Sequence, residues 1–362
     1  MRTGTATLPL HGGKAPAWLF QRMRLLAREV TLVVVSEFGP DEMLRRLSDP
    51  AWFQAFGCVL GFDWHSSGVT TTVCGALKDG LAGLEHESGL VFAGGKGGTS
   101  RKTPAELREA GERVLRTDPE PLVYASRMAA KVDSSGLQDG YQIYHHTFVT
   151  TLDGRWAVVQ QGMRDTDRTA RRYHWLGEGV GDFVVEPHAA VTAEARASAE
   201  VLNLVAGESA GARDVVAELA RMASERIGAE LARLKSLELP RHHEVRLADI
   251  RPENLAKAFL ATYESQPAGF EELLATPGVG PKTVRALTLI SELVYDTPAS
   301  RRDPAVFSYA HGGKDGHPYP VDRATYDRDI GILHEALRQA KVGRSEKLEA
   351  FRRLAALERV AG

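Results

Sequence analysis

The segment Leu273–Val294, LLATPGVGPKTVRALTLISELV, constrains the fold of this chain more than any other stretch. Apolar residues recur at helical spacing on both sides of a Pro-Gly-Val-Gly turn at 277–280. Gly278 and Gly280 can take the positive φ of a tight turn and leave room for a ligand beside the backbone. Pro281 suits the first position of the next helix, whose free N–H groups and dipole attract anions. The sequence therefore predicts two helices joined by an anion-binding turn.

This segment resembles the helix-hairpin-helix, a motif with which polymerases, nucleases and DNA repair glycosylases bind the DNA phosphate backbone. The residues PGVGPKT carry the resemblance. It implies DNA as the partner, with other repair proteins as further candidates. The expected DNA contacts are Gly278, Val279, Gly280, Lys282 and Thr283. An ordinary pair of helices with a glycine turn is the alternative.

The charge balance bears directly on DNA binding. Lys and Arg number 45 against 47 Asp and Glu, a formal net charge of −2, so the chain has no global positive field. DNA contacts must come from local patches and backbone groups. One patch is predicted at Arg168, Arg171 and Arg172, close to Tyr173 and Trp175 in sequence, where a base could stack on an aromatic ring. A solvated, charged turn is the alternative for this patch.

The sequence indicates a cytoplasmic protein that does not associate with membranes. Cys58 and Cys74 are too few for a disulfide framework. The longest apolar run, Val30–Val35, is far shorter than a membrane span, and the first residues lack the apolar core of a signal peptide.

Hydrophobic periodicity divides the chain into three parts. Residues 1–188 are predicted to form an α+β domain with antiparallel hairpins, which we expect to carry any catalysis. Residues 189–237, rich in Ala, Glu, Arg and Leu, are predicted to be a helical connector. Residues 238–362 are predicted to be an all-α domain that contains the helix-hairpin-helix.

The strongest local prediction is a β-hairpin in which YQIYHHTFVTT and RWAVVQQ flank Leu152-Asp153-Gly154. Thr103 and Glu106 have the spacing of a capping box at the start of a helix. Shorter strands are predicted at three places: Val69–Val73, Leu90–Ala93 and Phe183–His188.

Carboxylate and imidazole side chains in the first part of the chain indicate a divalent metal, Mn²⁺ or Mg²⁺, that could activate water and neutralise a phosphodiester. On a strand, Asp63 and His65 would point to one face, whereas His145 and His146 would point to opposite faces. The predicted metal ligands are Asp63, His65 and His146. The predicted catalytic residues in this part are Asp63, His65, Lys131, Asp133 and His146. Structural histidines beside turns are the alternative.

No nucleotide cofactor is expected. The glycine-rich stretch Gly94–Gly98 lacks the full phosphate-loop pattern, and no GxGxxG lies between a predicted strand and a helix.

Repair glycosylases suggest a second reading of the helical part. Lys282 stands where bifunctional members carry the lysine that attacks the sugar, and Pro320-Val321-Asp322 resembles the context of their catalytic aspartate. The separation, 322 − 282 = 40 residues, is longer than that family usually shows. A phosphate contact for Lys282 and a helix N-cap for Asp322 are the alternatives.

Most of the chain is similar to a prokaryotic protein family catalogued as a domain of unknown function. The stretches that carry this resemblance are LPLHGGKAPAWL, GFDWHSSGVTT, AGGKG, AAKVDSSGLQDGYQIYHH, WAVVQQGM, ARRYHWL and AHGGKDGHPYPVDRATYD. It implies one multidomain unit and brings no catalytic assignment. Three hypotheses follow: a metal-dependent nuclease in DNA repair, a glycosylase or abasic-site lyase that uses Lys282 and Asp322, and a non-catalytic DNA-binding protein that recruits others.

Overall fold

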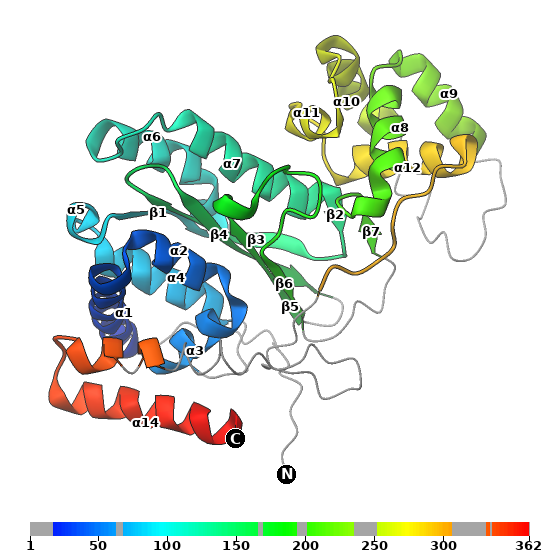
Figure 1. Cartoon of the computed structure of the whole chain (residues 1–362). Helices are drawn as coiled ribbons and strands as arrows, with labels where there is room; N and C mark the ends of the chain where they lie inside the picture. The colour runs from blue at the N-terminus through cyan, green and yellow to red at the C-terminus, as the bar shows by residue number, and fades with distance from the viewer. Residues whose placement is uncertain are drawn as a thin grey trace.

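The structure is a computed structural model that describes residues 17–62, 68–165, 169–193, 201–234, 252–305, 331–333 and 335–361. An antiparallel sheet lies in the middle of the molecule, with helices on both of its faces (Figure 1). Helices also form both ends of the described chain, so the fold is mixed α and β, as the sequence predicts at this coarse level.

The central sheet has the strand order β1-β3-β4-β5-β6, and every neighbouring pair is antiparallel. Its strands are β1 (Leu90–Lys96), β3 (Gln142–Thr151), β4 (Trp156–Arg164), β5 (Thr169–Leu176) and β6 (Ala190–Thr192). The predicted hairpin is confirmed: β3 and β4 are joined through Leu152–Gly154, where Gly154 has φ +89° and Gly154 N donates to Thr151 O at 3.1 Å.

One face of the sheet is covered by the N-terminal helices. These are α1 (Ala17–Phe38), α2 (Pro40–Ser48), α3 (Pro50–Leu60) and α4 (Gly68–Leu81), and the short α5 (Glu85–Ser88) leads into β1. Asp49 caps α3, because its side chain accepts from Ala51 N at 2.8 Å and Trp52 N at 3.2 Å. The core on this side joins helix residues such as Trp52 and Phe56 to Val149 and Val159 of the sheet.

The opposite face is covered by α6 (Thr103–Arg113) and α7 (Glu120–Lys131). A 3₁₀ turn, η1 (Gly97–Lys102), precedes α6, and a π-helical turn, η2 (Val132–Gly136), follows α7. Phe148, Val158 and Trp175 of the sheet belong to the core on this side. That core also includes residues of the C-terminal helices, which places them in contact with the sheet layer.

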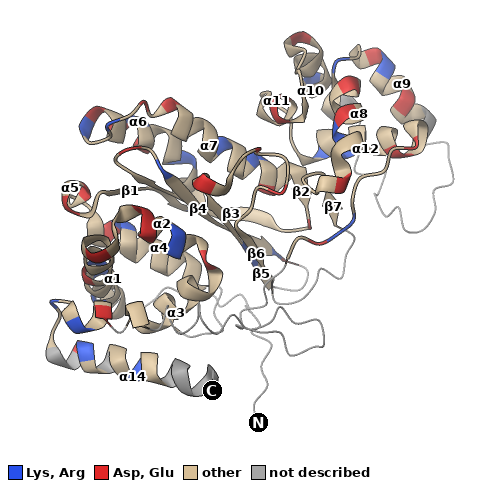
Figure 2. Cartoon of the chain, viewed as in Figure 1, with Lys and Arg blue, Asp and Glu red and all other residues tan. Residues whose placement is uncertain are grey.

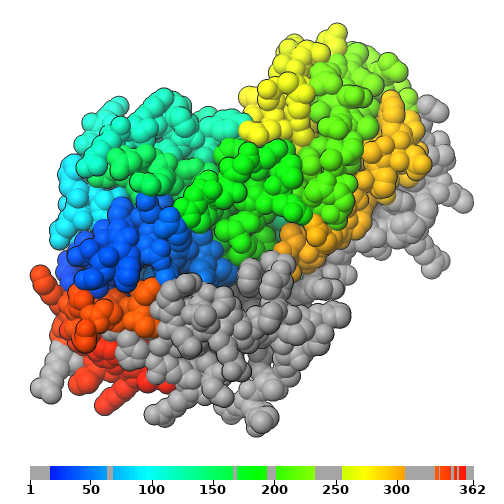
Figure 3. Space-filling view, viewed as in Figure 1, coloured from blue at the N-terminus to red at the C-terminus, as the bar shows by residue number. Residues whose placement is uncertain are grey.

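The C-terminal helices pack beside the far end of α7 (Figure 1). They are α8 (Ala210–Ala220), α9 (Ser224–Leu234), α10 (Pro252–Ser265), α11 (Phe270–Ala275) and α12 (Pro281–Tyr295). A small antiparallel sheet is formed by β2 (Leu137–Gln138) and β7 (Leu202–Asn203). Two 3₁₀ turns lie in connecting segments: η3 (Gly177–Gly179) follows β5, and η4 (Gly207–Ser209) precedes α8. The last helix, α14 (Arg344–Ala361), lies at the other end of the molecule, against the N-terminal helices (Figure 3).

Three local predictions are wrong for identifiable reasons. Val69–Val73 lies in α4, where Val69, Val73 and Leu77 are all buried at helical spacing, so the burial of one helix face overrides β-branched propensity. Phe183–His188 is irregular: the Asp182 side chain accepts from Val184 N at 2.6 Å, and Glu186 takes φ +44°. The described part of the predicted connector, 189–193 and 201–234, contains β6 and β7, and its α-helices begin at Ala210.

The predicted helix start at Thr103 is confirmed, but the capping box is not formed. Glu106 instead accepts from Gly94 N at 2.7 Å and from Lys78 Nζ at 2.7 Å. The domain boundaries after residues 188 and 237 stay predictions. One hydrophobic core contains residues from all three predicted parts, for example Phe148, Val216 and Leu287.

Candidate nucleic-acid interface

The predicted turn lies between α11, which ends at Ala275, and α12, which begins at Pro281. Gly278 has φ +86°, a conformation that L residues with a Cβ rarely adopt. Val279 is only 2% exposed, so its side chain anchors the turn in the core while Gly278 stays exposed.

The turn is braced by residues of the sheet layer. Lys131, the last residue of α7, donates from Nζ to Val279 O at 2.5 Å, and burial lowers the pKa of Lys131. Gln138 of β2 donates to Pro281 O at 2.9 Å and accepts from Arg285 Nε at 2.8 Å. Lys131, predicted as catalytic, is therefore placed as a support of the turn.

The surface of the turn is mostly backbone. A Cβ built at Gly278 or Gly280 would meet nothing within 4 Å, and no side chain in the described part of the chain caps α12. Lys282 is exposed beside this helix start, whereas Thr283 is buried. Of the predicted DNA contacts, the backbone of Gly278 and Gly280 and the side chain of Lys282 face outwards. The side chains of Val279 and Thr283 are turned into the core.

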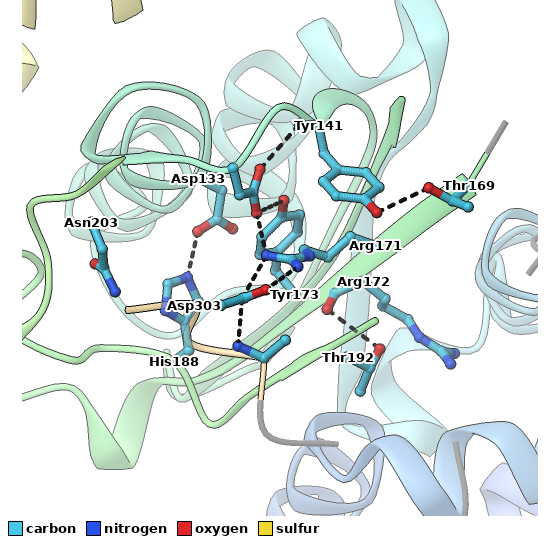
Figure 4. A network of polar contacts seen from close by, with 12 residues as sticks. Asp133, Tyr141, Thr169, Arg171, Arg172, Tyr173, His188, Thr192, Asn203 and Asp303 are labelled. Atoms are coloured by element: carbon cyan, nitrogen blue, oxygen red, sulfur yellow. Dashed lines mark hydrogen bonds and ion pairs between the residues drawn. The ribbon is translucent and has the colours of Figure 1, made fainter. Parts of the chain in front are cut away.

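Arg171 does not form part of a surface patch. It is completely buried on β5, donates to Asp139 Oδ2 at 2.9 Å, and forms a paired contact with Asp303 at 3.0 and 2.8 Å (Figure 4). Tyr173 also donates to Asp139, at 2.7 Å, and burial raises the pKa of this carboxyl group. Arg171 therefore ties the sheet to the segment that follows α12.

Arg172 is buried on the other face of the sheet. It donates to Gln54 Oε1 at 2.8 Å and lies 4.6 Å above the ring of Phe53. Neither guanidinium offers a surface to a phosphate, which corrects the predicted contacts at Arg171 and Arg172. The physical reason is that β5 is an inner strand, so alternate side chains enter two covered cores. Arg168, the third member of that patch, lies outside the described residues.

Asp133 is the centre of a buried polar network. Its carboxylate accepts from Gln160 Nε2 at 2.5 Å and Trp175 Nε1 at 3.0 Å, and lies 2.5 Å from His188 Nε2. Asp133 itself is fully buried in η2.

His146 extends this network towards α7. Its Nδ1 lies 2.9 Å from Gln160 Oε1 and its Nε2 lies 2.8 Å from Ser126 Oγ. Burial lowers the pKa of His146, which favours the neutral ring. The prediction that His145 and His146 point to opposite faces is confirmed, since His145 instead contacts Thr147 on the side of the N-terminal helices.

Gln160 contacts both Asp133 and His146, and its contact with His146 can be predicted from strand pairing. Counting outwards from Leu152–Gly154 places His146 opposite Gln160, which is the pairing observed. Ser126 and Trp175 come from α7 and β5, and sequence spacing carries no signal for their convergence on this network.

The predicted metal site is not assembled in the part of the chain that the structure describes. No group of three His, Cys, Asp or Glu residues is arranged there to hold a metal ion, and both ring nitrogens of His146 already have partners. Asp63 and His65 lie outside the described residues, as does Asp322, so the metal site and the Lys282–Asp322 pair stay predictions. Lys282 itself is exposed.

A protein-family model described as "Protein of unknown function (DUF763)" matches residues 4–321. The chain belongs to this family. The match includes the central sheet, the buried network of Asp133 and the turn between α11 and α12, so the family unit contains all three. No curated protein and no solved structure matches the chain. Among the described helices, none has the length and apolar character needed to cross a membrane.

Proposed function

We propose that this protein binds DNA along its phosphate backbone, through residues 276–280 and the N-terminus of α12. The observation that carries the proposal is Gly280, the residue before the first turn of α12. Its backbone is extended, with φ −145° and ψ −175°, and a Cβ there would meet nothing. The fold therefore does not require glycine at this position.

A capping side chain at Gly280 would slightly favour the isolated fold. Ser, Asp or Asn at an N-cap stabilises a helix by a few tenths of a kcal/mol relative to Gly. Glycine instead leaves the N–H groups of α12 open and lets a bulky anion approach the backbone. A phosphate is the anion that suits such a site, because it accepts several N–H bonds and gains from the helix dipole.

The surroundings support a rigid and local contact. Lys282 adds an exposed positive charge next to the helix start, in a chain in which Lys and Arg lie among Asp and Glu over much of the surface (Figure 2). The bonds from Lys131 and Gln138 hold the turn before any ligand arrives, which reduces the entropy lost on binding.

Gly280→Val tests the proposal. We expect the variant to stay folded, with a loss of stability of no more than about 1 kcal/mol because Val caps a helix less well than Gly. We expect it to bind a duplex of about 20 base pairs roughly 10- to 100-fold more weakly, the loss of about one charge-assisted hydrogen bond. Fluorescence anisotropy measures the affinity. The matched control is Gly331→Val, another position where a Cβ meets nothing, on the side of the N-terminal helices. Equal affinity of the Gly280→Val variant and the parent chain would contradict the proposal.

Cleavage of DNA is a separate proposal that rests on the sequence. Plasmid, single-stranded and abasic-site DNA, each with EDTA, Mg²⁺ or Mn²⁺, distinguish the hypotheses. Metal-dependent cutting of undamaged DNA supports the nuclease, EDTA-resistant nicking at abasic sites supports the lyase, and binding without cutting supports a recruitment protein.

A further inference from the structure

The glycine-rich turn between β1 and α6 is exposed and carries only positive charge. From Gly94 to Pro104 the sequence is GGKGGTSRKTP, with no acidic residue. Lys96, Arg101 and Lys102 are exposed, and none has a carboxylate partner within the described part of the chain. Lys96 lies 6.0 Å from the ring of Tyr144. Elsewhere on the surface, arginines such as Arg45 and Arg108 are paired with glutamates.

The base of this turn is held firmly. Gly94 N donates to Glu106 at 2.7 Å, Lys78 donates to Gly94 O at 2.9 Å, and a Cβ at Gly94 would lie 2.3 Å from His146 O. Within the turn, Ser100 donates to Gly97 O at 2.6 Å and Thr103 donates to Ser100 O at 2.7 Å. The turn is therefore ordered before any ligand binds.

The tip of the turn has a glycine that the fold does not require. Gly97 has φ +59°, which favours glycine. Gly98 has no such φ, is exposed, and a Cβ there would meet nothing within 4 Å. Gly98 thus repeats the situation of Gly280, a bare backbone position beside unpaired cations.

We infer that η1, together with Lys96, is a second phosphate contact on the same nucleic acid. The inference rests on the proposed function, since it assigns a further part of one DNA-binding surface. Open glycine backbone accommodates a phosphate closely, and Arg101 and Lys102 supply the charge that neutralises it. The ligand is duplex DNA whose backbone contacts both η1 and the turn at residues 276–280.

The topology places the two turns within reach of one duplex. Lys96 pairs with His145 on β3, and Gln138 donates to Pro281 O beside the other turn. Gln138 and His145 are separated by 145 − 138 = 7 residues, which span at most roughly 25 Å. Both turns also belong to the layer of α6 and α7, since η1 leads into α6 and α11 packs against α7. The path from Gln138 to His145 is thus shorter than one turn of B-form DNA, about 35 Å.

The double variant Arg101→Ala/Lys102→Ala tests the inference in the full chain. Affinity for the duplex of about 20 base pairs is measured between about 50 and 200 mM KCl, where log K falls linearly with log salt by about 0.9 for each neutralised phosphate. We expect the slope to become smaller by about 1 to 2. Gly98→Val, which leaves the charge intact, is expected to weaken binding in the same experiment. The control is Lys341→Ala/Arg352→Ala, which removes two exposed cations on the side of α14.

The outcomes separate this inference from the proposed function. An unchanged salt slope and unchanged affinity in both η1 variants overturn the inference, whereas the Gly280→Val result alone decides the proposed function. A parent chain that binds no DNA overturns both. Inorganic phosphate at matched ionic strength tests the other source of the anion: if it saturates η1, as shown by amide shifts of Gly97 and Gly98, and duplex DNA does not displace it, the turn binds a small anion and the inference is overturned.

Discussion

Asp133 satisfies three buried donors with one carboxylate, and this explains why it lies where no solvent can reach it. Gln160, Trp175 and His188 come from two strands and a loop, so the residue links elements that are distant in sequence. A hub of this kind is costly to remove because each partner is left unpaired in the core. In the described structure its contacts are with side chains of the core, and its predicted catalytic role stays a prediction.

We expect Asp133→Ala to lower the free energy of unfolding by about 3–5 kcal/mol, since the substitution strands buried polar partners. Urea unfolding measures the loss. Asp133→Asn, which keeps the shape and one acceptor, should lose less. Asp153→Ala, which breaks an exposed pair with Arg116, should change stability by less than about 1 kcal/mol. A loss at Asp133 as small as that at Asp153 would contradict the assignment.

His145 predicts how stability depends on pH. Burial, helped by the positive charge of Lys96 and by His146, lowers its pKa to about 3 in the folded chain, from about 6.5 when unfolded. Below pH 6.5 the unfolded chain therefore binds a proton that the folded chain excludes. Stability contributed by this residue is lost as pH falls from about 6.5 to 3, by up to about 1.4 kcal/mol per pH unit. Urea unfolding of His145→Gln between pH 7 and pH 4 should show a shallower pH dependence than the parent chain; equal slopes would contradict the prediction.

At the scale of elements, the part of the fold that the sequence predicts is the part set by local pattern. The β3–β4 hairpin follows from alternation and an Asp-Gly turn, and its register already pairs His146 with Gln160. The structures of Val69–Val73 and Phe183–His188 do not follow from local pattern. Burial of one helix face decides the first, and a turn at Asp182 decides the second. The buried network was predictable only within the hairpin. Trp175 and Ser126 join it through sheet order and helix placement, which no sequence spacing encodes.

The junction of α7 and the turn gives a prediction at this scale. Lys131→Met keeps the apolar stem of the side chain and removes the hydrogen bond to Val279 O. We expect faster amide hydrogen exchange at residues 279–284, by roughly tenfold, and weaker DNA binding with little change in global stability. Arg127→Met, at an exposed position on the same helix, is the control for exchange in the turn. Exchange that stays at the parent rate would show that Lys131 does not brace the turn.

At the scale of the whole molecule, the helical C-terminal part is packed into the core of the sheet layer. Gly136 of η2 packs against this part: an added Cβ would lie 3.2 Å from Val205 Cγ1, after β7, and in ordinary contact, 3.5 Å, with Leu274 Cδ1 of α11. The family model likewise matches residues 4–321, a range that contains both the central sheet and helices α8 to α12. The position of the turn that we propose to bind DNA thus depends on packing between the helical C-terminal part and the sheet layer.

We expect a fragment of residues 238–362 to unfold without the cooperative transition of the full chain, since it lacks α7, η2 and α8, which cover the apolar residues of α11 and α12. Thermal unfolding followed by circular dichroism compares the two. A fragment that melts as sharply as the full chain would support an independent domain after residue 237.

The buried contacts of Arg171 connect distant segments of the folded chain. Arg171 joins Asp139, just before β3, to Asp303, beyond α12, and the Arg171–Asp303 contact alone links positions 132 residues apart. A disulfide would also restrict the unfolded chain, whereas this ion pair acts only in the folded state, and both cysteines of the sequence are buried and free. The clasp is ionic, so a reductant leaves it intact and acid releases it, because protonation of Asp139, whose pKa burial raises, removes one of its charges.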